Sequence, residues 1–214
     1  MLLAIGIYAN ESFPNWESAE TFKQDLRASA LVANLPNMTE ESHYLGISSS
    51  LNRVSSNLDE TYMIPSARIS IYPNPGYNIW TQFSKWPGDR PRFSVGTGVQ
   101  VEFPSENPIQ RRAIGLSWNE VSTEDYLQRD ISIHGLFSWS KNTLNYGCMA
   151  IIDLHHVLIE DQFGIPDYDK TLYQVVPYVN WMVKEQLKLT MALPIDAAGG
   201  TLSIGAEYHI GKRK

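Results

Sequence analysis

Two aspartates, a serine and a histidine stand where they could do chemistry together. Asp130 and Ser132 lie in one segment of alternating polar and apolar residues, and Asp153 and His155 lie in the next, across a tight turn at 141–142. Pairing the two segments about that turn gathers the four side chains on one face. A histidine beside two carboxylates can activate water as a general base or hold a divalent metal with N and O ligands. Asp130, Asp153 and His155 are therefore the candidate catalytic residues.

These residues can also satisfy one another as a hydrogen-bonded network, and we favour that interpretation. The sequence shows no serine-nucleophile motif, no phosphate-binding glycine loop and no nucleotide fingerprint. His155 and His156 are neighbours, so in a strand they point to opposite faces and do not make a metal motif. We expect no metal and no cofactor. The sequence favours a non-enzymatic role but leaves an enzyme open.

A second polar group is expected at the other end of the same folded unit. Pairing the last two segments about a turn near residue 198 brings Lys188, Glu207 and His209 together, and one lysine against one glutamate suits a static salt bridge. The same parity turns other polar side chains inward. The residues expected to line the interior are Arg68, Gln100, Ser132, His134, Asn180, Lys188, Glu207 and His209.

The composition narrows the class of protein. The chain has 214 residues, 43% of them hydrophobic, which suits one ordered domain. Its net charge of −6 argues against nucleic-acid binding, which needs a basic face. The single cysteine, Cys148, excludes an internal disulfide framework and a cysteine-rich zinc site. No apolar run approaches the roughly 18–20 residues of a membrane-spanning helix. A soluble β protein or a membrane β-barrel remains.

From residue 43 onward the sequence alternates with a period of two, which predicts β-strands. In the segment 93–103, Phe93, Val95 and Val99 share one face, while glycine and polar residues occupy the other. Turn residues separate the segments. The ten predicted strands are 43–54, 62–72, 77–86, 92–103, 110–121, 127–140, 143–159, 171–184, 186–196 and 200–210.

The two faces of these strands differ in a way that indicates a membrane. One face carries small residues such as Gly96, Gly98 and Ser117, which suit the crowded inside of a narrow barrel, and lacks the charge of a water-exposed face. The other face is nearly free of charge at mid-strand, where a lipid-facing lysine or arginine costs about 2–4 kcal/mol. We therefore predict an all-β, closed, antiparallel, up-and-down transmembrane barrel. Its lipid-facing residues include Val95, Val99, Ile152, Leu189 and Ile204.

Strand and loop lengths predict the size and orientation of the barrel. Twelve residues at about 3.3 Å each, tilted by about 40°, project onto roughly 30 Å, enough to cross a bilayer. Short turns roughly alternate with longer loops, as in barrels whose short turns are periplasmic and whose long loops are external. The chain termini are then periplasmic, with ten strands, or twelve if the segment before residue 43 supplies two. The group around Asp153 falls at the external end and the group around Lys188 at the periplasmic end.

The first 42 residues lie outside the alternating pattern. Residues 1–9 look like the back half of a secretory signal without its positive start, and would equally fit a first buried strand. Residues 10–42 are polar and irregular, so we expect a lead-in to the barrel or a plug. The barrel is expected over 43–211, followed by a basic tail at 212–214.

The last strand carries a resemblance to a known class of protein. Residues 203–210, SIGAEYHI, resemble the sorting signal on the last strand of outer-membrane barrels, polar-x-Gly-x-x-aromatic-x-hydrophobic. The basic tail departs from that pattern, because bacterial barrels usually end on the aromatic strand. The whole chain resembles a small Gram-negative outer-membrane barrel, with no characterised family matched within that group. The resemblance implies location in the bacterial outer membrane, with its lipids and the barrel-assembly machinery as partners, and leaves the oligomeric state unknown.

Two places in the pattern are irregular. Pro177 falls in mid-strand, where it removes a ladder hydrogen bond, so we expect a bulge or weak spot there. In the segment 77–86, Ile79 and Trp80 are adjacent apolar residues on opposite faces, so the inward face of that strand is ambiguous.

The predicted width of the barrel limits its function. Eight strands leave an interior just filled by side chains, and sixteen to eighteen leave a water channel, so ten should be mostly plugged or hold a thin polar passage. We expect a structural role or a narrow pathway for small or hydrophobic solutes, by fold analogy. Two alternatives remain. One is an outer-membrane hydrolase with an Asp/His site at the external rim, which resembles the ten-stranded outer-membrane proteases in strand count only. The other is a soluble β-barrel that binds a hydrophobic ligand.

Overall fold

The computed structural model describes residues 43–55, 61–86, 92–107, 109–122, 126–159, 168–196 and 199–212, which form one antiparallel sheet and its turns. The expectations for residues 1–42 and for the end of the tail lie outside the described residues. The strands are β1 His43–Ser55, β2 Thr61–Ile71, β3 Tyr77–Trp86, β4 Arg92–Phe103, β5 Gln110–Ser122, β6 Tyr126–Lys141, β7 Leu144–Ile159, β8 Tyr168–Lys184, β9 Leu187–Ala192, β10 Ile195–Asp196 and β11 Gly199–Lys212. In the part of the chain so described, no helix is long and apolar enough to span a membrane.

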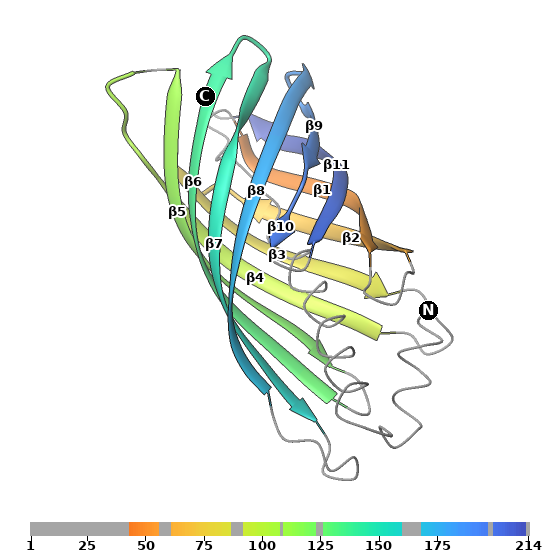
Figure 1. The fold of residues 1–214 in the computed structure, drawn as a ribbon. Coiled ribbons are helices and arrows are strands. Elements are labelled where there is room, and N and C mark those ends of the chain that lie inside the picture. The colour runs from red at the N-terminus through yellow and green to blue at the C-terminus, as the bar shows by residue number, and fades with distance from the viewer. Residues whose placement is uncertain are drawn as a thin grey trace.

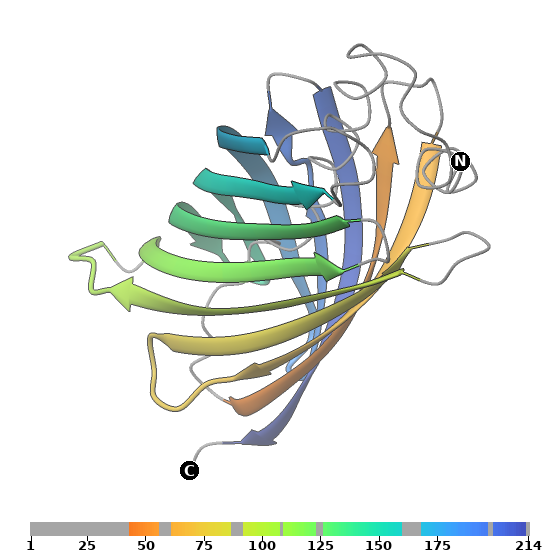
Figure 2. The ribbon, with the colours of Figure 1, turned by 90° about the horizontal axis from the view of Figure 1, so that it is seen from below.

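The sheet closes into a barrel because the first strand pairs with the last. β1 and β11 run antiparallel in unbroken register from Leu45↔Ile210 to Val54↔Thr201. Every other strand follows its sequence neighbour around the wall, and β9 and β10 together occupy one position between β8 and β11. Figures 1 and 2 show β1, in orange, lying beside β11, in dark blue. The prediction of a closed, up-and-down barrel of ten strands is confirmed.

The irregularity predicted at Pro177 is found opposite this residue, as a break between β9 and β10, and not in β8 itself. β8 passes through Pro177 and pairs it with Cys148 of β7 without a register shift. On its other side, the carbonyl of Pro177 accepts a hydrogen bond from Leu193 N (3.0 Å), where β9 has ended and β10 has not begun. Pro194, whose carbonyl accepts a hydrogen bond from Thr201 N of β11 (2.8 Å), has no N–H to offer β11, and Pro177 has none to offer Leu193. The two missing donors explain why one predicted strand appears as two. The register shift of β8 falls instead between Met182 and Lys184.

The two faces of the wall differ as sharply in the structure as in the sequence. Outward side chains are mostly large, apolar and exposed, and most inward ones are buried. The five residues expected to face lipid are all on the outer face and are 37% to 56% exposed: Val95, Val99, Ile152, Leu189 and Ile204. A water-soluble barrel would leave this apolar area exposed to solvent, whereas acyl chains would cover it.

Exposed aromatic side chains mark the two ends of the apolar band. The end with the short turns carries Tyr44, Tyr77, Phe103, Trp139, Tyr146, Trp181 and Tyr208. Phe83 and Phe93 lie toward the other end of β3 and β4. Along β4, the ten residue-to-residue steps from Phe93 to Phe103 rise at about 3.4 Å each and, tilted by about 40°, span roughly 26 Å. That distance matches the roughly 25 Å apolar band of outer-membrane barrels.

Candidate functional site

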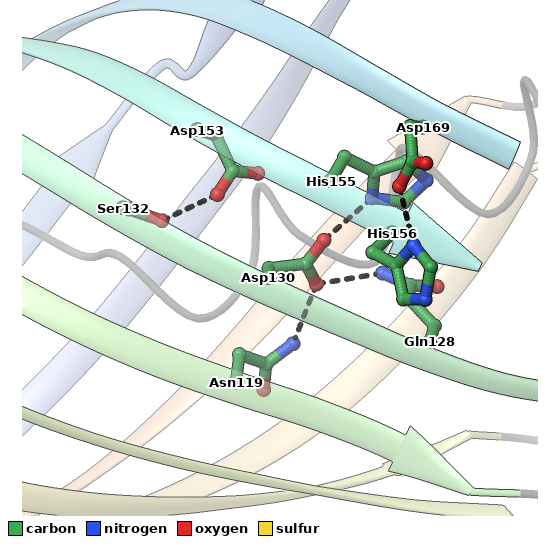
Figure 3. Close-up of polar contacts among 8 residues, drawn as sticks. All are labelled: Asn119, Gln128, Asp130, Ser132, Asp153, His155, His156 and Asp169. Atoms are coloured by element: carbon green, nitrogen blue, oxygen red, sulfur yellow. Dashed lines mark hydrogen bonds and ion pairs between the residues drawn. The ribbon is translucent and has the colours of Figure 1, made fainter. Parts of the chain in front are cut away.

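The structure brings together the four residues that the sequence groups near the external end. β6 and β7 pair directly, so Asp130 lies opposite His155, and Ser132 lies opposite Asp153. All four side chains point into the barrel and are at most 1% exposed (Figure 3). One donor atom from each of Asp130, Asp153 and His155 lies within 4.8 Å of the others. In the described residues this is the one group of three side chains with metal-ligating atoms at such spacing.

Asp130 is held by donors on three sides. Its Oδ1 lies 2.5 Å from His155 Nδ1, and its Oδ2 accepts hydrogen bonds from Gln128 Nε2 (2.8 Å) and Asn119 Nδ2 (3.2 Å). These donors come from β5, β6 and β7. Asn119 and His155 are the residues paired with Asp130 on the two neighbouring strands, and Gln128 is the preceding inward residue on its own strand, so all three reach the same carboxylate. The carboxylate is thereby oriented, and the imidazole is fixed through its Nδ1.

Asp153 has fewer partners than Asp130. Its Oδ1 accepts a hydrogen bond from Ser132 Oγ (2.7 Å), and its Oδ2 has no hydrogen-bond partner among the described residues.

A second histidine–aspartate pair lies on the outer face of the same strands. His156 and Asp169 are exposed and joined by a hydrogen bond. The two adjacent histidines thus belong to opposite faces of β7, and only His155 reaches the interior (Figure 3).

At the other end of the barrel, Glu207 is surrounded by donors. Lys188 and Glu207 are paired across β9 and β11 and form a buried ion pair. Tyr72 donates its hydroxyl to Glu207 Oε1 (2.6 Å), and His209 Nε2 lies 3.5 Å from the same oxygen. The rings of His43 and His209 lie 5.4 Å apart. Sequence parity indicated Lys188, Glu207 and His209, whereas it missed Tyr72, which follows the inward positions 68 and 70 of β2.

An arginine stacked on a tryptophan fills the interior between β2 and β4. The guanidinium of Arg68 lies 4.0 Å from the ring centroid of Trp80, and both side chains are buried. Trp80 therefore points inward, which resolves the ambiguity of segment 77–86. The ring lies where a Cβ at Gly98 would stand, and the imidazole of His134 lies likewise over Gly115. Glycine at these two positions lets large side chains fold down onto the wall.

The remaining predicted interior residues lie apart from the two charged groups. Gln100 is buried and is paired with Asn78 and Gly115. Asn180 is buried and accepts a hydrogen bond from Thr190 Oγ1 (2.7 Å). All eight residues expected to line the interior are buried there, at most 6% exposed.

The interior is not polar throughout. A cluster of buried apolar side chains covers the inner face of β5 to β9, and its members are Ala113, Leu136, Met149, Ile151, Val176, Tyr178 and Ala192. Sequence reasoning missed this cluster because β7 is apolar on both faces here, as in the run from Cys148 to Ile152. The only available signal was the presence of apolar residues at inward positions of β7, such as Met149 and Ile151, where other strands carry polar or small ones. Apolar side chains thus line the inner face of this part of the wall.

A closed antiparallel wall with an apolar exterior, aromatic ends and a largely polar interior has the form of an outer-membrane barrel. The chain has the fold of such a barrel. No protein-family model matches the sequence, and no curated protein matches it. No particular family within the group is therefore identified.

Three solved structures with a similar arrangement of strands are distant in sequence. The N-terminal β-barrel domain of Pseudomonas aeruginosa OprF is 6% identical, with a TM-score of 0.38, over 80% of this chain and 100% of that one. The KdgM porin, in complex with disordered oligogalacturonate, is 10% identical, with a TM-score of 0.44, over 77% and 99%. The translocator domain of the autotransporter NalP from Neisseria meningitidis is 8% identical, with a TM-score of 0.44, over 93% and 99%.

Proposed function

We propose that this protein is a bacterial outer-membrane barrel with a structural role, its interior closed to free diffusion. At most, a narrow pathway for small or hydrophobic solutes runs through it. The observation that carries this proposal is the burial of most inward side chains, both in the middle of the barrel and toward its two ends. A water-filled channel would leave such side chains in contact with solvent, as in barrels of sixteen or more strands.

Hydrogen bonds between strands support a rigid interior. Ser203 donates to Asn52 Oδ1, Asn52 Nδ2 donates to Ser66 Oγ (3.1 Å), and Ser66 Oγ lies 2.8 Å from Ser84 Oγ. This chain crosses β11, β1, β2 and β3, including the seam where the barrel closes. Such a network stiffens the interior, because a movement that breaks one of its hydrogen bonds leaves a buried polar group without a partner, which is costly.

The alternatives are less well supported. A hydrolase needs a substrate to touch its catalytic groups, yet Asp130, Asp153 and His155 are at most 1% exposed. A soluble barrel that binds a hydrophobic ligand needs an apolar interior and a hydrated exterior, and here the large exposed side chains are apolar.

Single-channel recording in planar bilayers tests the proposal. The refolded wild-type barrel should produce no stepwise conductance, whereas the double variant Arg68→Ala/Trp80→Ala, which removes the stack from the interior, should conduct. Conductance steps in the wild type as large as those of the double variant would refute a closed interior. A folded barrel in both samples, shown by far-ultraviolet circular dichroism, is the control for assembly.

A further inference from the structure

The charges at the two ends of the interior are balanced differently. At one end, Glu207 has Lys188 as an ion-pair partner. At the other, Asp130 and Asp153 share one imidazole, that of His155, and no lysine or arginine pairs with either carboxylate among the described residues. A protonated His155 would leave this group with one uncompensated negative charge, and a neutral His155 would leave two.

An uncompensated carboxylate is costly in this position. Asp153 is 0% exposed, and its Oδ2 has no hydrogen-bond partner in the described part of the chain. Figure 3 shows this second oxygen on the side of the carboxylate that faces His155, away from Ser132. Burying an ionised carboxylate without a partner is strongly unfavourable, so the group requires either a proton or a cation.

We propose that Asp130, Asp153 and His155 bind one divalent first-row transition-metal ion, such as Zn²⁺, inside the barrel. Two carboxylates and an imidazole are the donor types that suit such ions. Tetrahedral donors at about 2.0–2.2 Å from zinc lie roughly 3.5 Å from one another. The ion would therefore replace the 2.5 Å hydrogen bond between Asp130 and His155 and draw in the wider separations of the group, which all lie within 4.8 Å, by side-chain movements on the order of an ångström. This proposal differs from the sequence-based expectation, which was that the protein binds no metal.

The neighbours of the group fit this role. Gln128 and Asn119 donate to Asp130, and Ser132 donates to Asp153, so both carboxylates are held by groups outside the ligand set. Such supporting hydrogen bonds orient metal ligands in proteins. The ion would join β6 to β7 and would enter as the barrel folds, because the finished site is buried.

The test is to refold the barrel in detergent with excess ZnCl₂ and to remove unbound zinc by desalting. The zinc content per folded barrel is then measured by inductively coupled plasma mass spectrometry. The wild type should retain about one zinc ion, and its thermal unfolding midpoint should rise with zinc. Asp153→Asn and His155→Gln should each lower retained zinc at least tenfold and abolish that rise. Asp153→Asn has nearly the same shape and removes a buried charge, so it should fold.

The matched control is the double variant His156→Gln/Asp169→Asn, which removes a histidine–aspartate pair from the outer face of the same strands. It should keep the zinc. Loss of zinc in this control but not in Asp153→Asn would place the ion at the exposed pair and overturn the proposal. Absence of retained zinc in folded wild-type barrel would overturn it as well, and would show that a proton compensates Asp153. Neither result bears on the closed interior, which the conductance experiment tests separately.

Discussion

A lysine placed at Val99 tests whether the outer face meets lipid. Val99 lies on the outer face of β4, four residues from Phe103 and six from Phe93, and so near the middle of the apolar band. A lysine at the midplane of a barrel costs about 2–4 kcal/mol, which lowers the folding equilibrium constant roughly 30- to 700-fold. The matched control is Val183→Lys. Val183 is 38% exposed, against 39% for Val99, but it lies beyond Trp181 at the end of β8.

The assay is urea unfolding in phospholipid vesicles, followed by tryptophan fluorescence. Val99→Lys should lose about 2–4 kcal/mol of unfolding free energy, and Val183→Lys about 0–1 kcal/mol, because the cost falls near the interface. In a soluble barrel both positions would be solvated, and both variants would stay within about 0.5 kcal/mol of the wild type. Equal losses at the two positions would therefore refute the membrane assignment of this face.

Three further predictions concern two buried interior positions and the exposed turn between β8 and β9. Gly98→Ala should destabilise the barrel by about 1–3 kcal/mol in urea titrations, because its Cβ would meet the Trp80 ring, whereas Gly135→Ala has nothing within 4 Å and should be far milder. Glu207→Gln should cost about 3–5 kcal/mol by leaving Lys188 buried without its partner, against little change for the exposed Glu106→Gln. A hydrogen bond from Lys212, with its charge, lowers the pKa of Glu185 in the β8–β9 turn, so NMR titration should show that pKa rise toward its ordinary value in Lys212→Ala.

Alternation was sufficient to predict the wall of the barrel because each strand exposes successive residues to opposite faces. It could not decide the direction of Trp80, since Ile79 is equally apolar. Room over Gly98, on another strand, decides it. The interruption near Pro177 likewise depends on Pro194 in the neighbouring strand, where the sequence pattern indicated a continuous segment.

The candidate site was predictable only where strands adjacent in sequence are paired. Asp130 and His155 face one another across a two-residue turn, so counting residues from that turn brings them together. Tyr72 and Glu207 are separated by 135 positions, and their hydrogen bond depends on how the barrel closes. No local pattern carries that information, because the curvature of the wall determines which inward side chains meet across it.

The pairing of β1 with β11 has a consequence for the order of assembly. The C-terminal strand both fills the last gap and caps the exposed edge of the first strand, so a chain lacking it presents two unpaired edges to its surroundings. Open edges recruit other chains. Because the contacts that close the ring span nearly the whole described sequence, they form late and at high entropic cost. A nascent or truncated polypeptide should therefore depend on chaperones until residue 212 is available, and loss of the final strand should lead to aggregation rather than to a smaller barrel.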